Sequence, residues 1–175
     1  MCFSYLRTLD AFKNMTSNEK DNFHELLVKA ERYCAYQERC SNEVKQKLKE
    51  LDADEETSAK IVSSLSEDDF MSDERFARLF ASGKFRIKRW GKNKIRAELR
   101  MKKIPDNFIK NALNGIDEGE YLKTIQHLIK KKEKEVKSQN SKDKARKVVN
   151  FLLSKGFESE LIWKVLRKDA STGSA

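Results

Sequence analysis

The chain has 175 residues, of which 38% are hydrophobic and 37% are charged, so it is too polar for one thick core. Its 6 glycines and single proline favour helix throughout, in one or two ordinary domains or an array of small units. Residues 1–70 hold 10 basic and 15 acidic residues, whereas residues 71–175 hold 27 and 13. This strongly basic body predicts an acidic polymer or an acidic protein surface as partner.

Simple counts disfavour several classes of protein. Cys2, Cys34 and Cys40 lack the spacing of zinc sites and disulfide frameworks, so we expect reduced thiols and a cytoplasmic location. His24 and His127 have no Cys or His companion at ligand spacing, and we expect each to be a surface or half-buried helix residue. No stretch approaches the ~18 apolar residues that a membrane span needs, so a membrane is not an expected partner.

The first predicted module covers residues 28–70 and follows an N-terminal extension. That extension, with the start of the first helix, covers residues 1–27. The helix is predicted over about 19–40, because its apolar spacing is helical and Thr16 and Glu19 fit a capping box.

The second predicted module, residues 71–117, begins with a helix over 72–83. Ser72 fits the N-cap of that helix, since its hydroxyl can accept a hydrogen bond from the first turn. A second helix is predicted over 92–103. Pro105 marks the first turn of a third helix, because its fixed backbone suits that position.

The third predicted module covers residues 118–169 and precedes a polar tail, residues 170–175. Its first helix is predicted over 118–135 and ends before the polar break at 138–141. The lysine-rich run at 130–134 falls late in this helix, where cations suit the dipole. A solvated face therefore explains that run at least as well as a binding role.

A repeat relates the three modules. Segments 44–65, 95–116 and 148–169 align without gaps, at offsets of 51 and 53 residues. The coinciding apolar columns are Val44, Ile95 and Val148; Leu48, Leu99 and Leu152; Ala53, Ile104 and Phe157; Ile61, Ala112 and Val165; and Val62, Leu113 and Leu166. The predicted fold is all-α, with three tandem three-helix modules forming an elongated, curved array. The alternative is one irregular helical bundle.

The sequence presents no catalytic constellation. It has no glycine-rich phosphate loop and no Ser or Cys nucleophile set near a His. Its acidic clusters, at 52–56 and 67–69, fit helix starts, where carboxylates stabilise the dipole, better than a metal site. We therefore expect a protein without enzyme activity, cofactor or metal.

The most unusual stretch is residues 84–103, of which half are Lys or Arg. In a helix over 92–103, Ile95 and Leu99 face the core. Lys92, Arg96, Arg100 and Lys103 then form one stripe on the flank. Like charges in such a row oppose one another, so a binding role explains the stripe better than a structural one does.

Other candidate binding residues surround this stripe. Trp90 is expected to lie half in the core and half exposed. Its indole can stack on a base or an arginine, although a core role is favoured. Gly91 suits a left-handed or tight connection before the helix. The complete set of candidate partner- or DNA-binding residues is Arg75, Arg78, Lys84, Arg86, Lys88, Arg89, Trp90, Lys92, Lys94, Arg96, Arg100, Lys102, Lys103, Lys144 and Lys147.

Motifs in all three modules carry a family resemblance over about residues 28–168. The central module has Ser72-Asp-Glu-Arg-Phe-Ala-Arg78, then Gly91, Lys94-Ile-Arg96, Leu99 and Lys103-Ile104. The first has Ala30, Tyr33, Arg39, Ser41, Glu43-Val44 and Leu48, and the third has Lys144, Phe151-Leu152, Lys155-Gly156-Phe157 and Ile162. These motifs resemble the RecX family, bacterial regulators of the RecA recombinase. The chain departs from the family pattern at 51–54, where a glycine is often found.

The resemblance implies three tandem three-helix modules and no enzyme activity. It also implies a monomer that binds in the groove of the RecA–DNA filament and contacts single- or double-stranded DNA directly or through RecA. There it would inhibit ATP hydrolysis, strand exchange and coprotease activity, in DNA repair, recombination and the SOS response. The alternative from the basic residues alone is a RecA-independent, sequence-nonspecific DNA-binding repeat protein.

Overall fold

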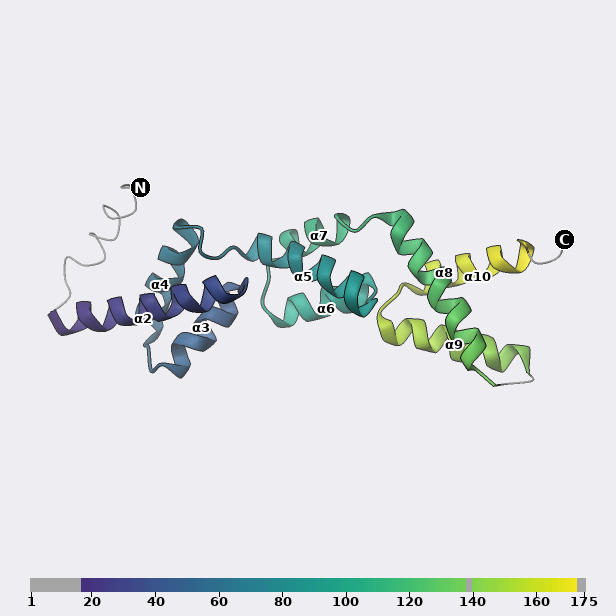
Figure 1. Ribbon diagram of the computed structural model, residues 1–175, viewed down its shortest axis with the longest axis horizontal. Coiled ribbons are helices and arrows are strands. Elements are labelled where there is room, and N and C mark those ends of the chain that lie inside the picture. The colour runs from purple at the N-terminus through teal and green to yellow at the C-terminus, as the bar shows by residue number, and fades with distance from the viewer. Residues whose placement is uncertain (1–16, 138–139, 173–175) are drawn as a thin grey trace. The chain divides into compact units, whose positions relative to one another are not determined.

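The computed structural model describes residues 17–137 and 140–172, and every regular element among them is an α-helix (Figure 1). The capping box predicted at Thr16 lies outside these residues. The helices are α2 (Ser17–Tyr36), α3 (Ser41–Glu50), α4 (Glu55–Glu67), α5 (Asp73–Lys88), α6 (Lys92–Met101), α7 (Asp106–Asn114), α8 (Glu118–Glu135), α9 (Ser141–Lys155) and α10 (Ser159–Thr172). The all-α prediction and the grouping into three-helix modules are confirmed.

The repeat columns form the cores of the modules. Val44, Ile95, Val148, Leu48, Leu99 and Leu152 are all 0% exposed. They lie on the inner faces of α3, α6 and α9, at the i, i+4 spacing of one helix side. Burial of such a stripe supplies most of a short helix's stability. The alignment therefore identified equivalent core positions.

A left-handed residue ends the first helix of each aligned pair. Asp52, Lys103 and Gly156 have φ angles of 59°, 60° and 89°. Two helix-closing bonds accompany this turn, from the Ala53 N–H to the Leu48 carbonyl and from the Phe157 N–H to the Leu152 carbonyl, both 3.1 Å. The helix predicted to reach residue 103 ends earlier for this reason.

Two other predicted helix ends also differ from the structure. The helix predicted over 19–40 ends at Tyr36, and Cys40 becomes the N-cap of α3. Pro105 precedes α7 as its N-cap instead of lying in its first turn. Ser72 does act as a cap, since its hydroxyl accepts a 3.2 Å bond from the Arg75 N–H.

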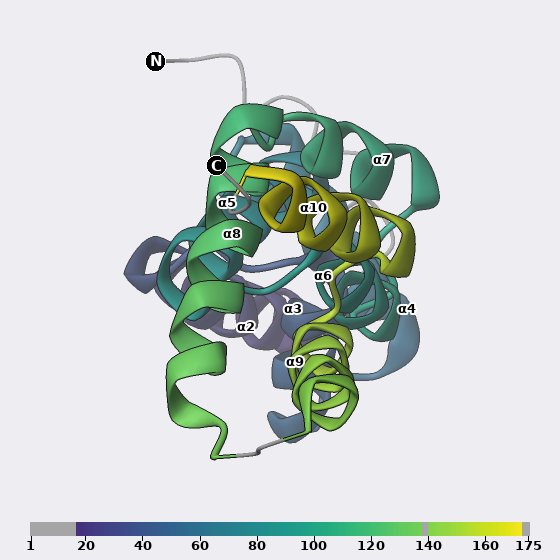
Figure 2. The ribbon, with the colours of Figure 1, turned by 90° about the vertical axis from the view of Figure 1, so that its right-hand side faces the viewer.

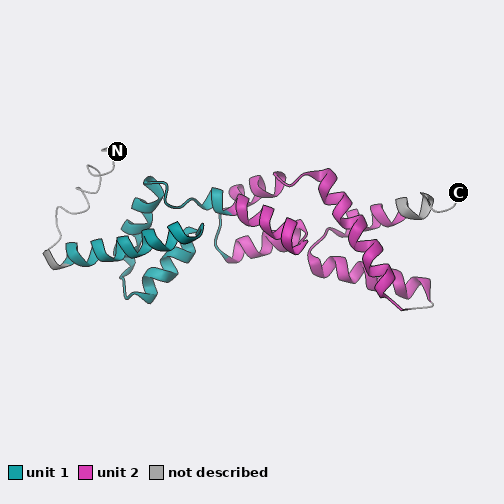
Figure 3. Ribbon diagram, in the orientation of Figure 1, with its two compact units in different colours: residues 1–76, 102–104 teal, residues 77–101, 105–175 magenta. Residues whose placement is uncertain are grey.

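The chain divides into two compact units (Figure 3). Unit 1 comprises residues 1–76 and 102–104, and unit 2 comprises residues 77–101 and 105–175. The first turn of α5 and the turn after α6 thus belong with the first module. The core of unit 1 is built from α2, α3 and α4, with Phe23, Leu26, Leu48, Ile61 and Leu65 among its buried side chains.

Ion pairs connect the first module to the module 2 residues of unit 1. Arg75 Nε donates to Glu38 at 2.9 Å, and its Nη1 donates to Asp69 at 2.6 Å. The Lys102 ammonium donates to Glu43 at 2.5 Å. Both basic side chains are only 28% exposed, so these bonds are partly screened from water.

Within unit 2, the start of α6 is capped by residues of the third module. The Gly91 N–H donates to the Lys155 carbonyl at 2.9 Å, and the Asn93 N–H donates to the Gly156 carbonyl at 3.0 Å. The first turn of a helix has no internal partners for these donors, so the third module satisfies them. Figure 2 views the molecule with this third module toward the reader.

Tyr121 completes the contact between the two modules. Its hydroxyl accepts from the Lys92 N–H at 2.8 Å and donates to Glu158 at 2.6 Å. The ring is 2% exposed and packs against Phe85 and Phe157. We refer to the contacts of this tyrosine and of the α6 start with the third module as the α6 junction.

Gly91 and Gly156 are required by close packing at the α6 junction. A Cβ atom on Gly91 would collide with the backbone of Gly156 and Phe157, and one on Gly156 would collide with Lys94. The connection at Gly91 was predicted to be left-handed or tight, and its left-handed residue is Arg89, with a φ of 52°. The prediction of a tight connection is confirmed.

Candidate partner-binding surface

Helix α5 extends five residues beyond its predicted end and carries much of the basic surface. The buried side chains Ala77, Ala81 and Phe85 continue its apolar stripe through the last turns. Lys84, Arg86 and Lys88 therefore lie on a helix. Cations in the last turn also stabilise the helix dipole, which favours this extension.

Four basic side chains at α5 and its C-terminal end are free to meet a partner. Arg78, Arg86, Lys88 and Arg89 are exposed. None of them makes an ion pair or a side-chain hydrogen bond to any residue that the structure describes. Their charge is consequently directed at solvent.

Trp90 lies between the core and the surface, and lysines contact its ring. The ammonium groups of Lys84 and Lys94 are 5.1 and 4.7 Å from the ring centroid. Lys84 is also 5.0 Å from the ring of Phe80. These cation–π contacts fix the two lysines beside a half-buried indole. The predicted position of Trp90, half in the core and half exposed, agrees with its partial burial.

The stripe predicted on α6 is partly neutralised by neighbouring residues. Arg100 pairs with Asp106 at 3.0 Å, and Arg96 donates to the Asn93 side chain at 2.8 Å. The Arg100 pair is exposed, so it contributes little to stability and leaves the arginine available. Lys92 Nζ lies 5.0 Å from the Tyr121 ring centroid.

The remaining candidates have varied surroundings. Arg75 and Lys102 are held by carboxylates of the first module, as described above, so both have a structural role. Lys103 is exposed in its left-handed turn. In α9, Lys144 is half-buried, and Lys147 pairs with Asp143 at 2.8 Å.

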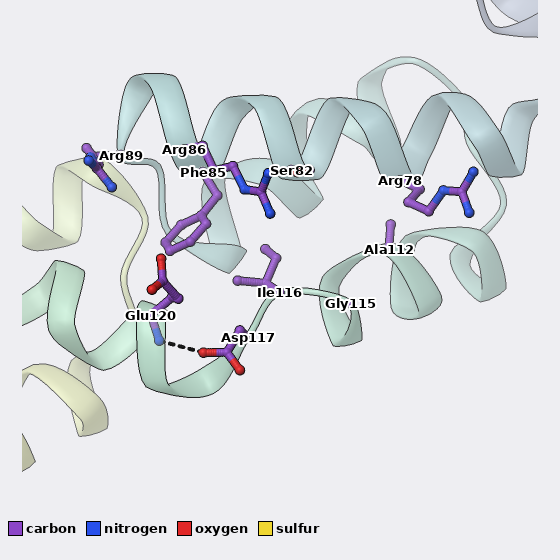
Figure 4. A pocket seen from close by; sticks show the side chains of 10 residues that line it. All are labelled: Arg78, Ser82, Phe85, Arg86, Arg89, Ala112, Gly115, Ile116, Asp117 and Glu120. Atoms are coloured by element: carbon purple, nitrogen blue, oxygen red, sulfur yellow. Dashed lines mark hydrogen bonds between the residues drawn. The ribbon is translucent and has the colours of Figure 1, made fainter.

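A groove of about 480 Å³ runs beside α5 in unit 2 (Figure 4). Arg78, Phe85 and Arg86 line it from α5. Asp117 and Glu120 line it from the start of α8. The two acidic residues were not among the predicted site residues. Their sequence signal was the N-cap pattern, since Asp117 accepts a 2.7 Å bond from the Glu120 N–H.

The described residues offer no obvious catalytic chemistry. Burial raises the pKa of the Cys34 thiol to about 11 and also raises the pKa of Cys40, so both are poor nucleophiles at neutral pH. In the part of the chain that the structure describes, no group of three His, Cys, Asp or Glu residues could hold a metal ion. None of the described helices is long and apolar enough to cross a membrane.

The fold and the surface together define a helical-repeat protein with an exposed basic surface. Sequence models of two RecX domains match the chain: the second three-helix domain over residues 72–113 and the third over 118–166. These matches cover more than half of the chain.

Curated relatives agree with these matches. The regulatory protein RecX of Chlorobaculum tepidum is 34% identical over 122 residues, which cover 69% of this chain and 72% of the relative. The RecX of Clostridium tetani is 30% identical over 153 residues, covering 86% and 69%. The chain belongs to the RecX family of regulatory proteins.

Solved structures support the same fold. The crystal structure of RecX from Lactobacillus salivarius has a TM-score of 0.79 at 25% identity and covers 85% of this chain and 97% of its own. A second crystal structure of a regulatory protein RecX has a TM-score of 0.81 at 23% identity and covers 91% and 85%.

Proposed function

We propose that the protein binds in the groove of the RecA–DNA filament and inhibits ATP hydrolysis, strand exchange and coprotease activity. It would act as a monomer in the cytoplasm, in DNA repair, recombination and the SOS response. The observation that carries this proposal is the set of exposed, unpaired basic residues at the end of α5, in a chain of the RecX family. A surface of one sign suits an acidic protein and the DNA that it encloses.

The backbone at Arg89 and Lys103 also favours a binding role. Both residues are exposed and hold left-handed conformations, which glycine adopts at lower energy. The position of the third module that is equivalent to Lys103 is a glycine, Gly156. A basic side chain on a backbone conformation with an energetic cost supports a use for that side chain in recognition.

The proposal is tested by reversing charge at the free arginines. We expect Arg86→Glu with Arg89→Glu to raise the concentration that half-inhibits RecA ATPase and strand exchange by about tenfold or more. The matched control is Lys130→Glu with Lys131→Glu, which makes the same change of charge on exposed residues of α8. This control should change inhibition by less than about twofold, because those lysines fit a solvated face.

The outcomes separate the possible functions. Wild-type protein that leaves RecA ATPase and strand exchange unchanged at stoichiometric amounts would contradict the proposal. An equal loss of inhibition in both variants would show that inhibition depends on the net charge of the protein and not on the position of the arginines. Tight binding to DNA without RecA, surviving moderate salt, would support the alternative of a nonspecific DNA-binding protein, for which phosphate contacts alone predict a steep salt dependence.

A further inference from the structure

The outward face of α5 carries an apolar stripe. Leu79, Gly83 and Ile87 are spaced four residues apart and therefore lie on one side of the helix. Leu79 is 52% exposed and Ile87 is 77% exposed. Single exposed apolar side chains are ordinary, but two that are aligned along one side of a helix give another molecule an apolar surface to cover.

Basic residues flank this apolar stripe. Arg78 and Arg86 lie on one side, where they line the groove of Figure 4. Lys84 lies on the other side, near Trp90. Beyond Glu74, helix α5 contains no acidic residue. The combination of an apolar centre and cationic edges is complementary to an amphipathic segment that carries carboxylates.

No close contact within the described chain explains why residue 83 is a glycine. A Cβ atom placed on it would meet no atom within 4 Å, whereas the same atom on Gly91 or Gly156 would collide with backbone. Glycine in a helix interior weakens the helix relative to alanine. Gly83 therefore leaves a shallow notch between Leu79 and Ile87, where the backbone of a partner can approach closely.

We propose that this face of α5 docks an acidic amphipathic helix of the partner protein. The inference rests on the proposed function, because it assigns this part of the basic surface to protein and not to phosphate. The apolar side of the partner helix would cover Leu79 and Ile87 across Gly83. Its carboxylates would pair with Arg78 and Arg86.

A protein partner fits this face better than nucleic acid does. The sugar–phosphate backbone can pair with the arginines, but it gains nothing from burying Leu79 and Ile87. An amphipathic helix uses both kinds of side chain. The distance between the two apolar residues along the axis is about 12 Å, so about two turns of a partner helix cover the stripe.

The groove beside the stripe determines on which side the bound helix carries its acidic residues. Its far wall carries Asp117 and Glu120, which repel carboxylates. Acidic side chains of the partner are consequently favoured on the α5 side, close to Arg78 and Arg86. An apolar side chain of the partner can enter the groove toward Phe85.

The first test removes the apolar contacts and keeps the charge. Leu79→Ser with Ile87→Ser should weaken binding to RecA filaments on single-stranded DNA by about tenfold, because a buried apolar contact carries much of an interface's affinity. Binding to the same DNA without RecA should stay within about twofold, because phosphate contacts are unchanged. The matched control is Leu153→Ser with Trp163→Ser, which removes exposed apolar side chains of α9 and α10 and should leave both affinities unchanged.

The second test fills the notch at Gly83. Gly83→Leu should raise the melting temperature, because leucine favours helix and its Cβ atom meets no neighbour. It should also weaken filament binding by about tenfold or more. A purely structural role of Gly83 predicts no loss of binding in this more stable variant. Filament affinity like that of the wild type in both the double variant and Gly83→Leu would overturn the inference and leave the proposed function intact.

Two other results would also decide the matter. An equal loss of binding to naked DNA in the Leu79 and Ile87 variant would overturn the inference in favour of a nucleic-acid occupant. Wild-type protein that binds no RecA filament would overturn the proposed function, and the inference that rests on it would fall at the same time.

Discussion

At the scale of single residues, the same left-handed turn is made by aspartate, lysine and glycine in the three modules. Asp52 tolerates this conformation because a short polar side chain can bond locally, and Gly156 adopts it freely. Lys103 has neither advantage. The first module thus has an aspartate where a glycine is often found, and the backbone of the turn is left-handed all the same.

We expect Lys103→Gly to raise the free energy of unfolding by about 1 kcal/mol. A left-handed backbone costs energy for a lysine, and glycine adopts the same conformation without that cost. If Lys103 also contacts the partner, the same variant should inhibit RecA less. Chemical denaturation and the ATPase assay check the two effects separately. A variant that is less stable than the wild type would show that the Lys103 side chain supports the fold.

Gly91 offers the opposite case. Gly91→Ala should lower the free energy of unfolding by about 2 kcal/mol or more, because the added methyl group collides with the backbone of Gly156. Gly83→Ala makes the same chemical change where space is open, and it should stabilise the protein by about 0.5–1 kcal/mol. Thermal melts of both variants provide the comparison. Equal effects at the two positions would contradict the close packing described at Gly91.

At the scale of secondary-structure elements, α6 depends on the third module for its first turn. Tyr121→Phe removes one hydroxyl and leaves the Lys92 N–H and the Glu158 carboxylate without this partner. We expect a loss of about 1–3 kcal/mol in the free energy of unfolding. Hydrogen exchange should show the largest loss of protection at the start of α6. Unchanged protection there would mean that water replaces the hydroxyl at no cost.

The same tyrosine predicts a dependence on alkaline pH. Burial, and then the hydrogen bond to Glu158, raise the pKa of Tyr121 well above its ordinary value near 10. The folded protein keeps the proton where the unfolded chain releases it. This contribution to stability is therefore complete below about pH 10 and declines as the pH rises further. Melting temperatures of wild type and Tyr121→Phe between about pH 8 and 11 should converge at the alkaline end.

Much of the element pattern was readable from sequence, and the exceptions have physical reasons. Helical periodicity located the core residues, and the limits of α8 were predicted correctly. The ends of α5 and α6 were not. Helix α5 is longer than predicted because its apolar stripe continues through Phe85. Helix α6 is shorter because Lys103 adopts a left-handed conformation, which a lysine in the sequence does not predict.

The candidate site was only partly readable. The sequence itself contains a concentration of basic side chains at 84–103, but it does not show which of them are free. Arg75 is neutralised by Glu38, a residue 37 positions away, whereas Arg86 has no partner among the described residues. Such pairings depend on tertiary contacts, and a single sequence contains no periodic signal for them. The exposed stripe on α5 was missed because isolated leucines and isoleucines at a surface are ordinary.

At the scale of the whole molecule, each compact unit has a core of its own. Leu48→Ala removes a wholly buried side chain from unit 1, so we expect a loss of about 2–5 kcal/mol in that unit's stability. Hydrogen exchange should show faster opening in α2 to α4 and unchanged rates in α8 to α10. Equal acceleration throughout would show that the described chain unfolds as one cooperative unit.

The capping of α6 by the third module has a consequence for biosynthesis. A ribosome releases residue 91 long before residues 155 and 156, whose carbonyl groups accept the bonds from the start of α6. Until those residues emerge, the helix lacks its N-terminal partners and its buried side chains have an incomplete enclosure. The start of α6 thus gains its N-terminal partners only late in translation, after residues 155 and 156 have emerged.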